Sequence, residues 1–406
     1  MPTPLLELSV KNYKSLRDVT VRLGPLNVLV GPNGSGKSNL LDVIQFLGDS
    51  AREDLGPALA RRQGFERVYF RGEPGVPDPD ISIHVKANVT SYARESAPDE
   101  YVLSFWRPQL LHRTVTNRDI LTRAERFTFK RSKGHGRRIT ISGSKAEWAE
   151  IRGEKKEKTS GFALRSDSLG LSTLPRLSPA QGGNEVRKMA ELFSTFRVFD
   201  VDARAARQPS TVSSSDTLQP DASNLAAFLN YLSKDEESFE RLQEDARAII
   251  PGLERIHLRK VGGAAEAVAI ELEESGLTGR TTLAEASFGT IRALALLAML
   301  YDPNPPLLTC VEEIDHGFHP YVFDRLVDRL RDASKRTQFL IATHSPTLVN
   351  RLRADELIVC ERDSKTGASL IPAADPKDIR AMEKRAQGRM GLGELWFTGS
   401  LGGVPR

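Results

Sequence analysis

The chain has 406 residues, of which 39% are hydrophobic and 27% are charged, so it can bury the cores of two or three ordinary domains. Its net charge of +4 is the balance of 57 basic and 53 acidic residues, so overall charge neither requires nor excludes a nucleic-acid partner. The chain opens without a basic leader, and its longest apolar run, at 293–301, is less than half of the length that crosses a bilayer. We therefore expect a cytoplasmic protein with no membrane partner.

The first part of the chain predicts a strand, a glycine-rich turn and a helix, followed by a sheet. Strand-like runs at 5–10 and 26–31 precede a predicted helix at 38–50. From about residue 80 to 145, apolar and polar residues alternate, which predicts an antiparallel sheet. Residues 150–188 are charged and then rich in Ser, Gly and Pro, which predicts an irregular insertion.

The second half of the chain predicts helices and then a parallel sheet. Helical periodicity marks 185–196, 224–232, 236–250 and 287–302, with a strand at 267–274. The last third alternates between strands and helices and is typical of parallel strands with helices packed on the sheet. Its predicted strands are 307–313, 338–345 and 356–362, and its predicted helices are 321–334 and 346–352. Cys310 and Cys360 lie in apolar runs and form no CxxC pair, so we expect buried, reduced core residues.

The strongest motif is GPNGSGKS at 31–38, which fits G-x-x-x-x-G-K-[ST] and lies between a strand and a helix. Its glycines let backbone N–H groups surround phosphate oxygens, and the helix N-terminus adds its positive dipole end. We expect Lys37 to neutralise the β- and γ-phosphates of ATP and Ser38 to hold Mg²⁺. The expected nucleotide-binding residues are Gly31, Pro32, Asn33, Gly34, Ser35, Gly36, Lys37, Ser38 and Asn39.

Two adjacent carboxylates, Glu312 and Glu313, close the apolar strand LLTCVEE. A P-loop ATPase needs one carboxylate to hold Mg²⁺ and a second group to activate the attacking water. We expect Glu312 to be the metal ligand and Glu313 the catalytic base. His316 and His319 follow, which offers a zinc alternative, but zinc peptidase sites space their histidines at i, i+4 with the glutamate between them. His344 ends another apolar strand, ATHSP, where it can contact a phosphate oxygen or the attacking water.

Together these motifs resemble the ABC-type ATPases of the RecF/SMC-like group, in particular the short "AAA family ATPases" that lack a coiled coil or a Toprim domain. GPNGSGKS resembles their Walker A motif, LLTCVEE their Walker B motif, IDHGFHP their D-loop, and ATHSP their switch histidine. ASFGTIRAL occupies the signature position, so the resemblance implies that Ser287 and Gly289 contact nucleotide. Departures are Glu312 for the usual aspartate and Phe288 for a small or acidic residue. KNYKSL resembles the opening strand of the group.

The resemblance implies an α/β ABC-ATPase head with a P-loop central sheet, an antiparallel β subdomain and a helical lid and signature subdomain. We divide the chain into an N-terminal ATPase lobe (1–150), an insertion and lid (151–285) and a C-terminal ATPase lobe (286–406). The resemblance also implies a homodimer, in which the signature turn of one copy caps the γ-phosphate of ATP held by the other. ATP and Mg²⁺ are the expected cofactors.

The expected function is that of an ATP-hydrolysing switch or motor in DNA repair or anti-phage defence, with double-stranded DNA or a separately encoded nuclease or toxin as partner. The alternative is a slow nucleotide sensor that restrains such a partner without binding DNA. A nuclease within this chain is disfavoured, because about 60 residues after His344 are too few for a Toprim domain. The DxD pair Asp200 and Asp202 is interpreted as part of the lid.

Several basic segments have no assigned role. Residues 131–138 (RSKGHGRR) and 155–158 (KKEK) could meet DNA phosphates or form solvated surface turns. Arg61, Arg62, Gln63, Arg67 and Arg71 follow the first predicted helix and could lie near nucleotide or DNA. Near the C-terminus, Leu395, Trp396 and Phe397 could dock a partner or fold back on the core.

Overall fold

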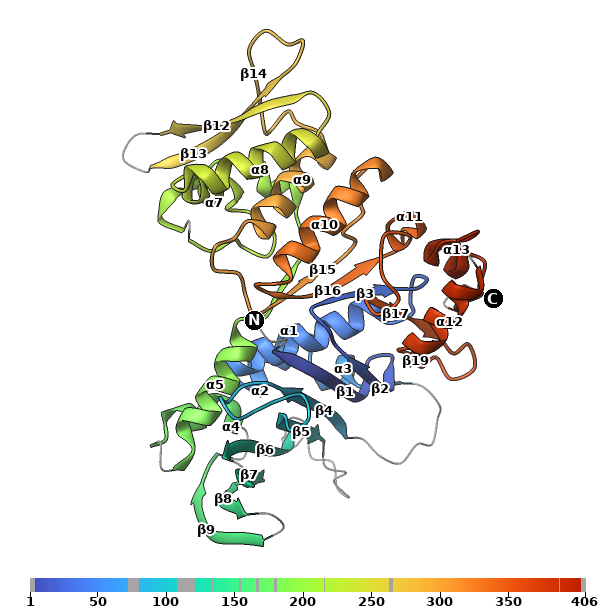
Figure 1. Ribbon diagram of the computed structural model, residues 1–406. Coiled ribbons are helices and arrows are strands. Elements are labelled where there is room, and N and C mark those ends of the chain that lie inside the picture. Colours follow the sequence, from blue (N-terminus) through green and yellow to red (C-terminus); the bar gives the residue numbers. More distant parts are fainter. Residues whose placement is uncertain are drawn as a thin grey trace.

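The computed structural model describes residues 4–402 except 72–79, 108–120, 133, 153–154, 166–167, 179–180, 215, 263–265 and 387. A central parallel sheet lies between an antiparallel sheet and a separate lid (Figure 1). The described chain therefore has the α/β architecture that the sequence predicts.

The central sheet has the strand order β10-β15-β16-β3-β17, and all its neighbours pair in parallel. Its strands are β3 (Leu26–Val30), β10 (Arg197–Phe199), β15 (Leu308–Val311), β16 (Gln338–Thr343) and β17 (Leu357–Val359). Every residue of β3 and β16 is buried, as expected for strands covered on both faces. This confirms the predicted parallel sheet and places the ends of β3, β15 and β16 at one edge.

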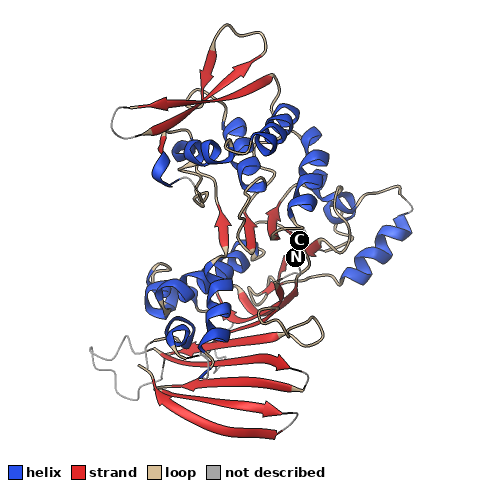
Figure 2. Cartoon of the chain, turned by 60° about the vertical axis from the view of Figure 1, so that its left-hand side comes forward, coloured by secondary structure: helices blue, strands red, loops and turns tan. Residues whose placement is uncertain are grey.

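The antiparallel sheet has the order β2-β1-β4-β5-β6-β7-β8-β9, and helices gather on one of its faces (Figure 2). Buried and less buried residues alternate along β4, as a sheet with a single covered face requires. The strands are β1 (Leu5–Tyr13), β2 (Leu16–Arg22), β4 (Ile81–Ala87), β5 (Asp99–Trp106), β6 (Thr122–Ser132), β7 (His135–Ser142), β8 (Lys145–Arg152) and β9 (Lys155–Ala163).

The predicted irregular insertion at 150–188 is wrong for residues 155–163, which form β9 at the sheet edge. Charged edge strands protect a sheet from further pairing, which explains why KKEK does not look like a core strand. Its side chains lie outside the described residues. Beyond it, α4 (Gly170–Thr173), η2 (Leu174–Arg176) and α5 (Gly183–Ser194) follow. The boundary expected at 150 falls inside β8, so we propose that the N-terminal lobe extends through α5, whose Met189 and Phe193 join its core.

Helix α1 (Lys37–Glu53) crosses between the central and antiparallel sheets. It buries Leu40, Val43, Ile44 and Leu47 in a core that also contains Leu29 of β3. Two short helices, α2 (Leu55–Ala60) and α3 (Phe65–Val68), continue the same layer. The P-loop helix is therefore held from both sides.

The lid combines helices with a small sheet, which makes it less helical than expected. Strand β13 (Ala267–Glu274) pairs with β12 (Leu253–Val261), β11 (Ser210–Thr211) and β14 (Arg280–Thr282). Its helices are α6 (Ala203–Ala206), η4 (Val212–Ser214), α7 (Leu225–Leu232), α8 (Glu236–Ile249) and α9 (Phe288–Leu300). Helix α9 is buried along nearly its whole length and shares one core with the lid and the central sheet. It therefore connects the two.

The C-terminal elements pack around the central sheet. They are η5 (Pro320–Val322), α10 (Phe323–Ala333), α11 (Pro346–Val349), β18 (Glu361–Arg362), β19 (Ser369–Leu370), α12 (Pro376–Ala386) and α13 (Leu392–Phe397). Helices α10 and α11 lie on the face opposite α1, and β19 lies beside β2. Leu395 and Trp396 are each 6% exposed, whereas Phe397 is 70% exposed, so α13 folds back on the core. No helix among the described residues is both long and apolar enough to cross a lipid bilayer.

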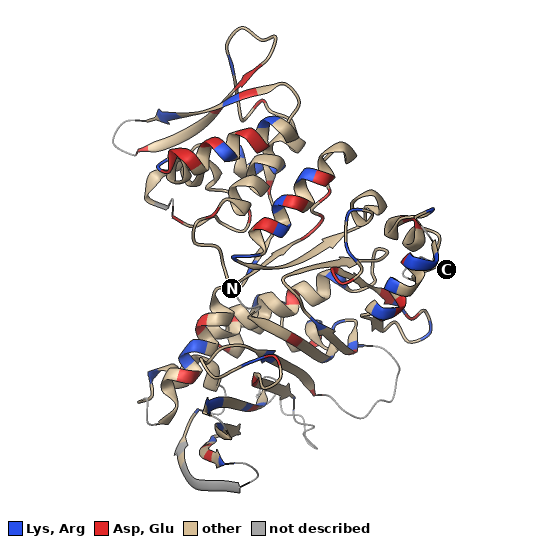
Figure 3. Ribbon diagram, in the orientation of Figure 1, with Lys and Arg blue, Asp and Glu red and all other residues tan. Residues whose placement is uncertain are grey.

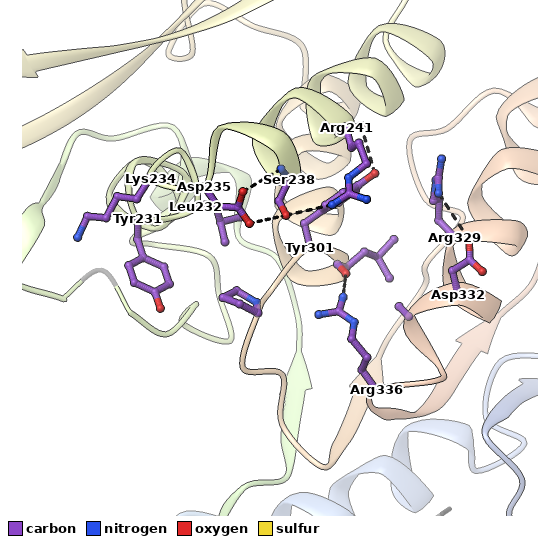
Figure 4. Close-up of a pocket in the computed structure, with 13 residues that line it drawn as sticks. Tyr231, Leu232, Lys234, Asp235, Ser238, Arg241, Tyr301, Arg329, Asp332 and Arg336 are labelled. Carbon is purple, nitrogen blue, oxygen red and sulfur yellow. Dashed lines mark hydrogen bonds and ion pairs between the residues drawn. The ribbon is translucent and has the colours of Figure 1, made fainter. Parts of the chain in front are cut away.

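A buried carboxylate joins the lid to the sheet. Asp245 of α8 is fully buried and accepts hydrogen bonds from Tyr301 Oη at 2.6 Å and Arg325 Nε at 2.8 Å. Arg329 Nε lies 2.6 Å from the same carboxylate. Burial and the Asp245 carboxylate raise the pKa of Tyr301. Beside this cluster lies a cavity of about 700 Å³, where Arg329 also faces Asp332 (Figure 4). The cluster ties α8, the end of α9 and α10 together.

We predict that Asp245→Asn lowers the free energy of unfolding by about 1–3 kcal/mol, because it leaves two arginines without their carboxylate, although both are partly solvated. Urea unfolding followed by fluorescence measures this as a lower midpoint at an unchanged slope. The control Asp378→Asn lies in the exposed first turn of α12 and should change it by less than about 0.5 kcal/mol. Equal effects of both variants would contradict the prediction.

Candidate functional site

The P-loop follows β3 and passes into α1 through backbone positions that require glycine. Gly36 has φ 103°, and a Cβ there would lie 2.1 Å from Ser369 Oγ. A Cβ on Gly31 would lie 2.2 Å from the Cys360 carbonyl oxygen. Any side chain at either position would therefore displace the segment 360–369 that packs on the loop.

Lys37 is buried, 5% exposed, and its ammonium donates to the main-chain oxygens of Gly31 at 2.8 Å and Pro32 at 3.0 Å. Burial lowers the pKa of Lys37, while the nearby carboxylates of Glu312 and Glu313 act in the opposite direction. The site therefore holds a buried cation beside two acids. A phosphate group could take the place of the loop carbonyls as its partner.

The remaining P-loop residues lie around this cation. Asn33, Gly34 and Ser38 are exposed at the mouth of the loop, and Ser35 is fully buried beneath it. Asn39 donates to Ser15 Oγ at 2.7 Å. The loop thus keeps its outer surface open to a ligand.

The two residues expected to hold Mg²⁺ are in direct contact. Ser38 Oγ donates to Glu312 Oε2 at 3.0 Å, although 274 positions separate them in the sequence. Burial raises the pKa of Glu312, the Ser38 hydrogen bond lowers it, and Asp200 and Glu313 raise it further. A hydroxyl and a destabilised carboxylate fit a hard divalent cation that keeps several waters or phosphate oxygens in its shell. When bound, Mg²⁺ would neutralise this accumulated negative charge.

Asp200 is a site residue that sequence reasoning misplaced. It follows β10, whose Phe199 pairs with Val311 of β15, so it ends beside Glu312 at the same sheet edge. Asp202 instead caps α6, where its carboxylate accepts the N–H of Arg204 at 2.8 Å. The interpretation of both aspartates as lid residues is therefore wrong for Asp200. The apolar run before Asp200 indicates a strand, but only the parallel pairing of β10 with β15 places Asp200 beside Glu312.

Glu313 and His344 lie at the ends of neighbouring strands. Glu313 adopts φ 47°, and its side chain is 58% exposed, with His316 Nδ1 at 3.4 Å. Burial lowers the pKa of His344, and Lys37 lowers it further, whereas Asp315 and Glu313 oppose that shift. His344 is therefore neutral at neutral pH and can accept or donate a hydrogen bond.

The signature turn packs against the D-loop of its own chain. Ser287 caps α9 by accepting the Thr290 N–H at 3.1 Å. A Cβ on Gly289 would lie 2.5 Å from the Gly317 carbonyl oxygen, so only glycine permits this approach. The ring of Phe288 lies 5.7 Å from that of His316. Phe288, which stands where the resemblance implies a small or acidic residue, thus makes a contact within its own chain.

Arg292 is a further site residue that the motifs did not reveal. It lies one turn into α9, is 8% exposed, and donates to the Glu313 main-chain oxygen at 3.1 Å. Burial lowers its pKa, and Asp200, Glu313 and Asp315 oppose this. Arg292 therefore connects the signature helix to the residue expected to act as base.

The two histidines of the D-loop have local protein contacts. His316 lies beside Glu313, and His319 Nδ1 accepts the Tyr321 N–H at 3.4 Å at the start of η5. In the described part of the chain, no group of three or more His, Cys, Asp or Glu side chains is placed to hold a metal ion.

A cavity of about 400 Å³ adjoins the P-loop. Lys14, Ser15, Asn39, Arg67 and Arg362 are among its lining residues. Arg362 also donates to the Gly34 oxygen at 3.3 Å. The cavity therefore places further cations and polar groups beside the P-loop.

Arg61, Arg62 and Gln63 serve the structure of the turn after α1. Arg62 is nearly buried and donates to Asp42 at 2.8 Å and Asp49 at 2.9 Å. Arg61 pairs with Glu53 on the surface, and Gln63 adopts φ 62°. Of this basic group, Arg67 and Arg71 line the cavity beside the P-loop.

A P-loop on a parallel sheet, with carboxylates at the next strand ends and a capped signature helix, defines an ABC-type nucleotide-binding head. The family described as "AAA domain, putative AbiEii toxin, Type IV TA system" matches residues 26–96 and 126–350, which is more than half of the chain. The chain belongs to this family and is an ABC-type ATPase of the RecF/SMC-like group.

Curated relatives match over short segments. The DNA replication and repair protein RecF of Magnetococcus marinus is 38% identical over 73 residues, 18% of this chain and 19% of that protein. The OLD nuclease of Thermus scotoductus is 50% identical over 46 residues, 11% and 9% of the two chains. The chromosome partition protein Smc of Desulfitobacterium hafniense is 40% identical over 75 residues, 18% and 6%. The matches thus span less than a quarter of each of these relatives.

Solved SMC heads match over nearly the whole chain at low identity. The SMC head domain from Thermotoga maritima is 15% identical, with a TM-score of 0.46, and the match covers 92% of this chain and 100% of that one. The Smc head from Pyrococcus furiosus, solved with the C-terminal domain of ScpA, is 14% identical, with a TM-score of 0.49 and coverage of 95% and 100%.

The raised pKa of Glu312 predicts a pH-dependent affinity for Mg²⁺. Only the ionised carboxylate binds the cation, so protons compete with Mg²⁺ as the pH falls toward a pKa that lies above the usual 4.5. We expect the Mg²⁺ concentration for half-maximal binding of a fluorescent ATP analogue to be higher at pH 5.5 than at pH 7.5. The terminal phosphate of the analogue also takes up a proton in this range, so in Glu312→Gln the pH difference should be smaller than in the wild type but not zero, and an unchanged difference would contradict the prediction.

Proposed function

We propose that this protein binds and hydrolyses Mg-ATP at the edge of the central sheet. The single observation that carries the proposal is the contact between Ser38 and Glu312, which joins the P-loop to the end of β15. This contact brings a phosphate-binding loop and a metal-binding carboxylate to one point. The flanking positions of Glu313 and His344 then supply a base and a polar group for the attacking water.

Each residue has a separate proposed role. Lys37 binds the β- and γ-phosphates, and the main chain of 31–38 donates to their oxygens. Ser38 and Glu312 would hold Mg²⁺, and the nearby Asp200 carboxylate would add to the negative charge that the cation neutralises. Glu313 takes the proton of the attacking water, and neutral His344 holds the γ-phosphate or that water by a hydrogen bond.

We propose further that two copies close the site. Ser287 is exposed at the N-terminus of the 13-residue helix α9, where a hydroxyl and free N–H groups favour an anion. Its own hydrogen bonds run to Thr290, and Gly289 lies against Gly317, which leaves the outer side of the turn for a second molecule. ATP would then link the P-loop of one copy to the signature of the other.

The relatives suggest the setting. Their names connect them with DNA replication and repair, nuclease activity and chromosome partition. We propose a cytoplasmic switch or motor in DNA repair or anti-phage defence, with double-stranded DNA or a separately encoded nuclease or toxin as partner. The alternative remains a slow nucleotide sensor that restrains such a partner.

The test is phosphate release by the purified chain. Release that requires both ATP and Mg²⁺ is the expected result, and no release above buffer at any Mg²⁺ concentration would overturn hydrolysis. Repeating the assay with duplex DNA at two salt concentrations separates the two settings. Stimulation that fades with salt favours a DNA-linked switch, because phosphate contacts are salt-sensitive, and an unchanged rate favours the sensor.

A further inference from the structure

We infer that the outer end of the antiparallel sheet binds single-stranded nucleic acid. The site, which we call the tip pocket, is a surface cavity of about 790 Å³. Tyr92, Arg94, Lys130, His135 and Arg138 are the lining residues that matter here. The inference goes beyond the proposed function and does not rest on it, because no part of the tip pocket belongs to the ATP site.

A buried carboxylate fixes the loop that lines the tip pocket. Asp99 at the start of β5 is fully buried, and its carboxylate accepts the N–H of Thr90 at 2.6 Å and of Lys130 at 2.7 Å. Thr90 Oγ1 also donates to the Lys130 oxygen at 2.9 Å. Burial raises the pKa of Asp99, and these N–H donors counter that shift. The loop that carries Tyr92 and Arg94 is therefore tied to β6, and the pocket is formed before any ligand arrives.

Strand alternation divides the basic residues of β7 between two environments. Arg137 points into the protein, is 2% exposed, and donates to Glu150 at 2.6 Å. The guanidinium carbon of Arg137 lies 5.4 Å from the centre of the Trp148 ring, and this contact also holds the side chain in place. Arg138 faces the other way, opposite Thr128 of β6, and is exposed. The sequence cluster 131–138 thus contains one structural arginine and one that lines the tip pocket.

The described lining of the tip pocket is basic. Arg94, Lys130 and Arg138 contribute cations, and none of the described lining residues is Asp or Glu. In Figure 3 basic and acidic segments mix along α8 and α10, whereas the lining of the tip pocket carries one sign of charge. Three like charges around a fixed concavity attract a polyanion more than a surface of mixed charge does.

An exposed aromatic ring decides between kinds of polyanion. Tyr92 is 56% exposed beside the three cations. Stacking on an aromatic ring, combined with contacts from Arg and Lys to phosphates, is how proteins bind single strands without sequence preference. The bases of a duplex are stacked on one another and offer Tyr92 no free face, and an acidic peptide has no base. The combination therefore favours an unpaired strand.

The test is the binding of a labelled twenty-residue oligothymidylate to the full chain without nucleotide, followed by fluorescence anisotropy over a range of salt. We expect the triple variant Arg94→Ala, Lys130→Ala, Arg138→Ala to bind at least about tenfold more weakly and to lose a salt slope of about 2, since each contact to a single strand contributes about 0.7. The matched control Lys365→Ala, Lys377→Ala, Lys384→Ala removes the same charge from exposed positions elsewhere. It should change the affinity less than twofold.

A second variant tests the stacking. Tyr92→Ala should weaken binding several-fold at every salt concentration without changing the slope, and Tyr92→Phe should restore it.

Equal loss in the triple variant and its control would overturn the tip pocket as the site. Equal binding of duplex and single strand, with no effect of Tyr92→Ala, would overturn the choice of ligand. Binding of labelled polyglutamate by a chain that does not bind the oligonucleotide would assign the pocket to an acidic protein instead. The triple variant should keep the wild-type rate of phosphate release, so the two proposals can fail separately.

Discussion

Glu313→Gln should reduce ATP turnover by about 10²–10⁴-fold while the protein still binds Mg-ATP, because the amide keeps the shape of the side chain but cannot accept a proton. Glu313 lies at the end of β15, and its main-chain oxygen is held by Arg292, so the substitution leaves the backbone contact intact. Phosphate release measures the turnover. Light scattering with ATP and Mg²⁺ should show this variant accumulating as a dimer, because hydrolysis no longer converts the ATP-bound dimer back to monomers.

The matched control is Glu254→Gln, which removes an exposed carboxylate from β12 of the lid. Its turnover should equal that of the wild type. If Glu313→Gln hydrolyses ATP at the wild-type rate, Glu313 is not the base. If it stays monomeric with ATP and Mg²⁺, the proposed sandwich is wrong even where turnover is lost.

Lys37→Ala should weaken the binding of ATP by roughly 30-fold or more, because the charge-assisted contacts to two phosphates are lost together. The fold should tolerate the change, because burial of the ammonium is unfavourable and lowers the pKa of Lys37, which offsets the loss of its contacts with the Gly31 and Pro32 oxygens and with the nearby acids. Titration of a fluorescent ATP analogue measures the affinity.

Lys384→Ala, on the exposed face of α12, is the control for the loss of one positive charge and should bind like the wild type. Thermal unfolding without nucleotide should be unchanged in both variants. Wild-type affinity for ATP in Lys37→Ala would show that the P-loop lysine does not bind the phosphates.

Much of the central fold could be predicted because its signals are local. The runs 307–313 and 338–345 are apolar enough to identify buried parallel strands, and each ends in a polar residue that the fold brings to the P-loop. Strand β9 could not be recognised, since an edge strand can be charged, and β12 carries too many polar residues to look like a strand. The lid therefore contains more sheet than expected.

The contact between Ser38 and Glu312 in the candidate site could be predicted from the sequence, because a short motif contains each residue. Asp200 and Arg292 were missed because their roles depend on pairing between distant segments. Asp200 reaches Glu312 only through the alignment of β10 with β15, and Arg292 reaches the Glu313 oxygen only because α9 packs beside that strand end. Neither lies within a recognisable motif.

Mixing two inactive variants tests most directly whether a second copy completes the ATP site. Ser287→Arg retains the P-loop but blocks the signature turn, and Lys37→Ala retains the signature but not the P-loop. Each variant alone should release almost no phosphate. Their mixture should recover measurable activity, because a mixed dimer contains one site with both an intact Lys37 and an intact Ser287. A mixture as inactive as its components, with Ser287→Arg still binding ATP like the wild type, would contradict the shared site. Full activity of Ser287→Arg alone would contradict it too.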